Sequence, residues 1–159
     1  MGGFGAQYPD VAVSGSFVHV VWQNTSNDGI YYRRSTDLGK TWEPEKKINH
    51  TPSGELTGFP YVVANGSNVF IFWEDTRDLA FWELYMVRST DNGTTWTTDQ
   101  RITPDDDHTS ENPSVAIWNN NLYLVWQDWY YFDATGETEI FFSKSMDNGA
   151  TWTTPTAIT

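Results

Sequence analysis

Ser35-Thr36-Asp37-Leu38-Gly39-Lys40-Thr41-Trp42 is the first of three stretches that follow one pattern, Ser-x-Asp-x-Gly-x-Thr-Trp. A pattern with five fixed residues that recurs three times does not arise from composition, so the chain contains an internal repeat. The shared residues are Ser35, Asp37, Gly39, Thr41 and Trp42, then Ser89, Asp91, Gly93, Thr95 and Trp96, then Ser145, Asp147, Gly149, Thr151 and Trp152.

The residues around each octapeptide also recur in a fixed order, which extends the repeat to nearly the whole chain. A proline opens each unit, a tryptophan follows, and an isoleucine comes after the octapeptide. These residues are Pro9, Pro60 and Pro113; Trp22, Trp73 and Trp126; and Ile48, Ile102 and Ile158. The chain is therefore one domain of three units, at residues 8–50, 58–104 and 111–159.

Each unit is predicted to form four strands joined by turns. In the first unit these are Val11 to Val13, Phe17 to Trp22, Ile30 to Arg34 and Trp42 to Ile48. The second strand is apolar on both faces in the other units, at Val69 to Trp73 and Leu122 to Trp126. Each small sheet must therefore be covered on both sides, as in sheets stacked around an axis. The predicted fold is an all-β propeller with three four-stranded antiparallel blades.

The octapeptide suits a tight turn between the third and fourth strands. The Asp carboxylate accepts hydrogen bonds from nearby backbone N–H groups, Gly provides a positive φ angle, and Trp anchors the outer strand. We therefore interpret the three aspartates as structural residues, with no catalytic residue, metal or cofactor assigned.

The octapeptides resemble the Asp-box (BNR) repeats of sialidases and related secreted propellers, including sortilin-type receptors and xyloglucan-cleaving glycosidases. The resemblance covers residues 8–159 and implies an extracellular or cell-surface location, although residues 1–5 lack signal-peptide character. Sialidases carry an Arg-Ile-Pro motif at the first blade and an arginine triad that binds the substrate carboxylate. The matching positions here are Gln7-Tyr8-Pro9, Gly58-Phe59-Pro60 and Glu111-Asn112-Pro113, which contain no arginine.

Charge and composition exclude several classes of partner. The 159 residues include 9 basic and 21 acidic side chains, for a net charge of -12, so nucleic acid and anionic membranes would be repelled. The chain has no cysteine, which removes disulfides and thiolate chemistry.

Three blades do not close a ring, since known propellers have about 4–8 blades. A head-to-tail pair of chains would give six blades, the number that the sialidase resemblance implies, so we expect a homodimer. The alternative is a fragment whose other blades have been removed.

The loops between second and third strands vary most in length, and we expect them on the face opposite the octapeptides. Aromatic rings beside carboxylates in these loops suit binding to sugar hydroxyls and ring faces. The alternative is that the aromatics are buried at the rim and the acids are paired or solvated. Arg77 is expected to be the only arginine on this face. The candidate ligand-binding residues are Glu74, Asp75, Arg77, Asp128, Trp129 and Tyr130.

A second acidic group, Asp105 to Asp107 with His108, lacks a recognisable cation-ligand spacing and is interpreted as a solvated turn.

Three functions remain open at this point. The first is a non-catalytic propeller that serves as a self-assembling scaffold or binds a glycan or a protein. The second is a glycoside hydrolase with carboxylates from Glu74, Asp75, Glu111 or Asp128 in the central funnel. The third is an engineered or excised half-propeller with no activity beyond assembly.

Overall fold

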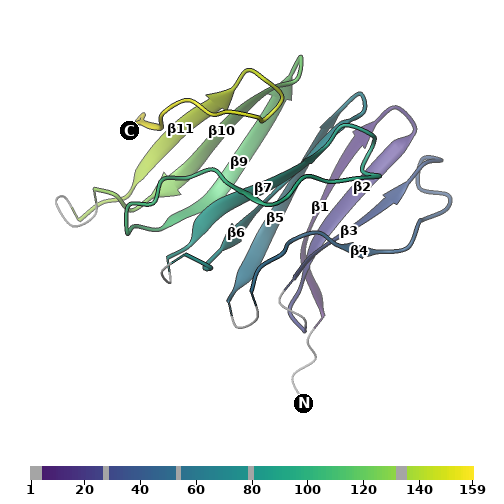
Figure 1. Cartoon of the computed structure of the whole chain (residues 1–159), viewed down its shortest axis with the longest axis horizontal. Helices are drawn as coiled ribbons and strands as arrows, with labels where there is room; N and C mark the ends of the chain where they lie inside the picture. Colours follow the sequence, from purple (N-terminus) through teal and green to yellow (C-terminus); the bar gives the residue numbers. More distant parts are fainter. Residues whose placement is uncertain (1–4, 27–28, 53–54, 79–80, 132–135) are drawn as a thin grey trace.

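The computed structural model describes residues 5–26, 29–52, 55–78, 81–131 and 136–159. The described residues contain no helix and form three four-stranded antiparallel sheets that lie side by side (Figure 1). The strands are β1 (Ala6–Ser14), β2 (Phe17–Asn24), β3 (Gly29–Ser35) and β4 (Lys46–Lys47) in blade 1; β5 (Thr57–Asn65), β6 (Asn68–Asp75), β7 (Glu83–Ser89) and β8 (Gln100–Arg101) in blade 2; and β9 (Ser110–Trp118), β10 (Asn121–Asp128), β11 (Glu139–Ser145) and β12 (Thr156–Ala157) in blade 3.

The strand order within each sheet follows the chain, so every blade is the predicted four-stranded meander. β5 lies between β1 and β9, which makes the first strand of each blade the innermost one.

Two predicted strand boundaries were wrong. The first strand of blade 1 begins at Ala6 rather than Val11, and a bulge between Gln7 and Asp10 accommodates Pro9 within the strand. The outer strand is only Lys46–Lys47 rather than Trp42 to Ile48. Pro44 cannot donate to the ladder, and the chain bonds to β3 on either side of it, through the N–H groups of Glu43 and Ile48.

The middle blade is buried on both faces because the residues of β6 alternate in direction. Val69, Ile71 and Trp73 pack in the core shared with blade 1, and Phe70 and Phe72 pack in the core shared with blade 3. All five side chains have no exposed surface. The prediction that each sheet is covered on both sides is therefore confirmed for the middle blade, whereas Val11 and Val13 of blade 1 are each 58% exposed.

The octapeptide turns have nearly the same hydrogen bonds in all three blades. In blade 1, Ser35 Oγ donates to Asp37 Oδ1 over 2.7 Å and accepts from Gly39 N over 2.8 Å. Thr41 donates its N–H and its hydroxyl to the two Asp37 oxygens, and these bonds lower the pKa of Asp37 to about 2. The residue before the glycine has a positive φ in each turn: 59° at Leu38, 57° at Asn92 and 61° at Asn148.

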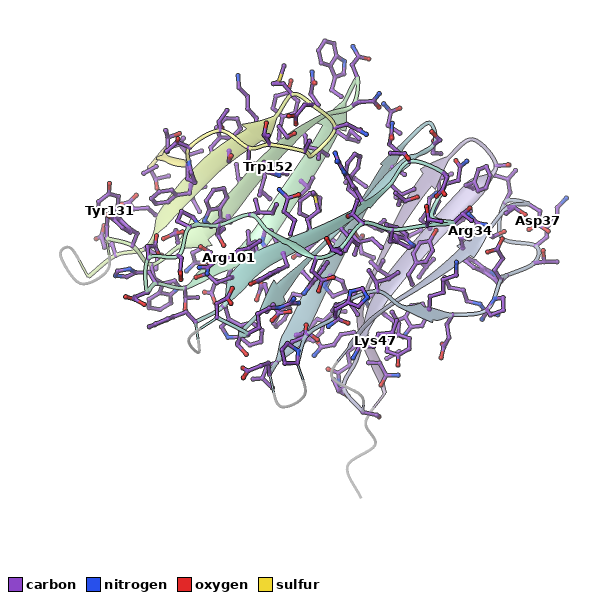
Figure 2. All side chains as sticks on the ribbon, in the orientation of Figure 1. Arg34, Asp37, Lys47, Arg101, Tyr131 and Trp152 are labelled. Atoms are coloured by element: carbon purple, nitrogen blue, oxygen red, sulfur yellow. The ribbon has the colours of Figure 1, made fainter. Side chains whose placement is uncertain are left out.

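These turns lie at the opposite end of the blades from the β2–β3 loops. Leu38 N bonds to Ser16 O in the β1–β2 turn, whereas the start of β1 pairs with the end of β2, Ala6 opposite Asn24. Figure 2 shows the two ends through Asp37, in an octapeptide turn, and Tyr131, in a loop at the other end.

Candidate ligand-binding rim

The candidate site lies where the inner strands begin, at the loop end of the blades, and we call it the rim. Each inner strand carries one residue with a positive φ directly before its proline: 50° at Tyr8, 50° at Phe59 and 55° at Asn112. A positive φ is costly for aromatic residues and is maintained only where the surroundings enforce it, often at functional sites. The strained residues belong to the bulge that recurs in the inner strand of each blade.

The strained aromatics of blades 1 and 2 form the wall of a surface hollow. Tyr8 and Phe59 have ring centroids 4.5 Å apart, and Tyr8 is 49% exposed. Trp82 meets the Phe59 ring edge to face, with centroids 6.4 Å apart. The hollow has a volume of about 210 Å³ and is lined by Tyr8, Pro9, Asp10, Phe59, Pro60 and Tyr61.

Glu74 is a buried carboxyl group of the rim that bonds to the next blade. The residue is 3% exposed, and its Oε1 accepts a hydrogen bond of 2.7 Å from Asn112 N in the next blade. Burial, opposed by the Asn112 bond and reinforced by the charge of Glu111, raises the pKa of Glu74 to about 7. Burial is the main cause of the raised pKa of Tyr61, and the charge of Glu74 raises it further. Glu74 is therefore close enough to the hollow to act on one of its lining residues.

Glu111 and Trp129 continue the rim into blade 3. Trp129 Nε1 donates to Glu111 Oε1 over 3.1 Å, and Trp129 N bonds to Thr109 O. The predicted residues Glu74 and Trp129 are therefore linked through the Glu111–Asn112 segment.

Asp75 and Asp128, two further candidates, accept equivalent hydrogen bonds in blades 2 and 3. Each is almost fully buried and accepts from the indole N–H of the tryptophan two residues earlier, over 3.0 Å from Trp73 and 2.7 Å from Trp126. Each also accepts from the backbone N–H two residues later, which starts the β2–β3 loop. These contacts give both aspartates a structural role in the loop.

Arg77 is held by ion pairs rather than pointing free into the rim. Its Nη2 lies 2.6 Å from Asp75 Oδ2 and 2.9 Å from Asp99 Oδ2, and its guanidinium stacks 4.2 Å from the centroid of Tyr85. Burial alone would lower the pKa of Arg77, but the bonds and charges of Asp75 and Asp99 raise it overall.

Arg101 corrects the expectation that Arg77 is the only arginine at this end. It belongs to the outer strand β8, yet its guanidinium pairs with Glu83 over 2.7 Å, and with Asp78 and Asp105. Sequence reasoning missed Glu83, whose pKa is raised to about 8 by burial, against the Thr103 bond and the Arg101 charge. The sequence could have indicated Glu83, because it begins the third strand of blade 2 and pairs directly with Asp75.

Tyr130, the last candidate, is 46% exposed and lies in an aromatic cluster with His108, Tyr131 and Phe141. The predicted candidates thus fall into separate environments, and only Glu74 and Trp129 join the rim. Residues 79–80 and 132–135 of the same loops lie outside the described residues.

Among the described residues, no group of His, Asp or Glu side chains is arranged to hold a metal ion, and no helix is long and apolar enough to cross a membrane.

Comparison with solved structures identifies the fold. Neither protein-family models nor curated protein sequences give a match. A Hadza microbial sialidase, Hz136, superposes with a TM-score of 0.69 at 19% identity, over 93% of this chain and 36% of that one. A GH93 α-L-arabinofuranosidase of Fusarium graminearum, solved with arabinobiose, gives 0.69 at 17% identity, over 97% and 48%. The Trypanosoma rangeli sialidase gives 0.64 at 18% identity, over 94% and 30%.

The chain therefore has the sialidase-like β-propeller fold. It comprises three blades of that fold and spans 30–48% of the length of these three similar proteins, which are glycoside hydrolase propellers. At these identities the similarity establishes the fold alone.

Proposed function

We propose that the chain is a non-catalytic propeller module that binds a neutral carbohydrate at the rim, in an extracellular or cell-surface setting. The observation that carries the proposal is the aromatic hollow of Tyr8 and Phe59, which has the carboxyl group of Asp10 in its lining. Aromatic faces pack against sugar rings, and carboxylates accept from sugar hydroxyls.

The charges around the rim favour a neutral ligand over an anionic one. Both arginines at this end are already paired, Arg77 with two aspartates and Arg101 with three acidic side chains. A sialic acid carboxylate would therefore have to displace existing ion pairs in a chain with a net charge of -12. Neutral sugars meet no such barrier.

Titration calorimetry with neutral oligosaccharides, arabinan fragments among them, tests the proposal. We expect Tyr8→Ala and Trp129→Ala each to weaken binding by about 3–10-fold, the range for loss of one aromatic contact. Met146→Ala is the matched control, because Met146 is 59% exposed at the opposite end of the blades. Retention of full affinity in both rim variants, or preference for sialylated over neutral glycans, would contradict the proposal.

A glycoside hydrolase is the second candidate, because Glu74 has a property that a general acid requires. A carboxyl group with a pKa of about 7 stays partly protonated at neutral pH, and Glu111 supplies a second carboxyl group nearby. Turnover of aryl arabinofuranosides or arabinan that disappears in both Glu74→Gln and Glu111→Gln would establish this function. Turnover unaffected by either change would exclude the pair.

A further inference from the structure

The contacts between neighbouring blades repeat at equivalent positions, and this repetition defines what each end face of the chain can bind. Strand pairing aligns Tyr32, Met86 and Phe142 in the third strands of blades 1, 2 and 3. Gly93, in the octapeptide of blade 2, lies directly against Tyr32, and Gly149, in blade 3, lies against Met86. Each third strand therefore packs against the glycine of the next octapeptide.

A second repeated contact is a cation that donates to the next octapeptide. Arg34 Nη1 donates to Asn92 O over 2.6 Å, and Arg88 Nη1 donates to Asn148 O over 2.8 Å. Strand pairing places Lys144 at the same position of blade 3, opposite Tyr123 as Arg34 is opposite His19. Lys144 is thus the cation at the equivalent position on the outer face of blade 3.

A third repeated contact joins the octapeptide tryptophan to the preceding blade. Trp96 meets Tyr32 edge to face at 5.0 Å, and Trp152 meets Phe72 at 6.1 Å. Trp42 lies on the outer face of blade 1 and is 37% exposed. An added Cβ on Gly39 would meet only Trp42, at 3.8 Å, so the notch that Tyr32 and Met86 fill in the other blades is open here.

The outer face of blade 1 exposes apolar residues whose equivalents in blade 2 are buried against blade 1. Val11 is 58% exposed, whereas the equivalent Val62 is 3% exposed in the core between blades 1 and 2. A hollow of about 300 Å³ on this face is lined by Val20, Trp22, Arg33, Trp42 and Glu45. Arg33 replaces the Val87 of blade 2 and is the basic group of the hollow.

We propose that the outer face of blade 1 binds the outer face of blade 3 from a second copy of this chain, so that two chains close a six-bladed ring. Phe142 of the second copy would enter the notch at Gly39, and Lys144 would donate to Leu38 O, the equivalent of Asn92 O and Asn148 O. The partner is a second copy because the contacts that join blade 1 to blade 2 and blade 2 to blade 3 use the same positions. The outer face of blade 3 carries one side of these contacts, and the outer face of blade 1 carries the other. A twofold axis makes both junctions identical.

The first experiment is light scattering on a sizing column across a range of concentrations. A closed ring predicts one species at twice the 18.2 kDa chain mass, with no larger species. A monomer at all concentrations, or a ladder of masses from open head-to-tail chains, would overturn the proposal.

Variants on both faces test which surfaces join. Val11→Glu places a charge on the face of blade 1, and Lys144→Glu reverses the donor on blade 3. Each change occurs twice in the ring, so a tenfold loss per junction becomes about a hundredfold rise in the dimer dissociation constant. Lys144→Arg restores the residue type found at Arg34 and Arg88 and is expected to leave the dimer intact.

Leu56→Glu is the matched control for Val11→Glu, because Leu56 is 54% exposed and lies directly before β5 of the middle blade, which takes part in neither junction. Circular dichroism of each monomer separates lost assembly from lost folding, since Val11 and Lys144 lie on the chain's own surface. A dimer that resists both Val11→Glu and Lys144→Glu would overturn the proposal even if its mass were correct. Glycan binding is measured separately, so failure here leaves the rim proposal standing.

Discussion

Substitution of Gly93 by alanine tests how tightly neighbouring blades pack. The new Cβ would overlap the Tyr32 hydroxyl oxygen and come within 2.8 Å of Tyr32 Cζ, at a φ of +79°. Tyr32 is 1% exposed, and a 2.7 Å hydrogen bond joins its hydroxyl to His19 Nδ1, so the ring has no free space to enter. The left-handed backbone costs alanine about 1–2 kcal/mol, overpacking about 1–3 kcal/mol, and the lost buried hydrogen bond about 1 kcal/mol.

The expected loss in the free energy of unfolding is therefore about 3–6 kcal/mol for Gly93→Ala, measured by urea denaturation. Gly66→Ala is the matched control in the same blade, because Gly66 has a φ of +58° and no atom within 4 Å of an added Cβ. Only the backbone cost applies there, about 1–2 kcal/mol. Equal losses in the two variants would refute the reasoning, since Tyr32 would then have moved without cost.

Three further results are expected. Burial, with a smaller contribution from the charge of Arg34, lowers the pKa of His19 from 6.5 to about 4, so the folded state resists protonation of this ring. As the pH falls from about 7 to 4, the free energy of unfolding of the wild type should therefore drop by about 3 kcal/mol relative to that of His19→Gln, measured by urea titration at each pH. Leu38→Asn should raise the unfolding free energy by about 0.5–1 kcal/mol by relieving the φ of 59°, seen as a higher melting temperature; no gain would mean that Leu38 is unstrained. Arg77→Met should cost about 3–5 kcal/mol at pH 7 because it leaves the buried Asp75 carboxylate without its ion pair, and a loss below 1 kcal/mol would contradict this.

The sequence predicted the blades because the repeat fixes several residues of each unit in order. Five octapeptide positions, a proline and a tryptophan per unit set the turn, the bulge and the second strand. The outer strand was overestimated because only two of its residues pair with the third strand in every blade, including blade 2, which has no proline there. Residue patterning does not show how many residues of an edge strand are paired.

The rim was predicted less well because neighbouring residues on one strand face different blades. Glu74 and Asp75 are adjacent, yet Glu74 bonds to blade 3 through Asn112, and Asp75 bonds to Trp73 and Arg77. Strand alternation already places Trp73 and Asp75 on one face, which was a usable signal for the structural role of Asp75. The contact between Glu74 and Asn112 spans 38 residues, and only the packing of two blades reveals it.

Blade packing also sets the shape of the rim, so assembly and binding are coupled if both proposals hold. Gln23 and Glu74 occupy equivalent positions, and each bonds to the inner strand of the next blade, Gln23 to Thr57 O over 2.7 Å and Glu74 to Asn112 N. Gln127 is the third residue of this series and would reach the inner strand of blade 1 in a second copy. Tyr8, at the start of that strand, would then gain the support that Phe59 and Asn112 receive from a preceding blade. Ring closure would thereby rigidify the aromatic wall of the hollow, which makes the closed dimer the form with the higher expected affinity for a ligand.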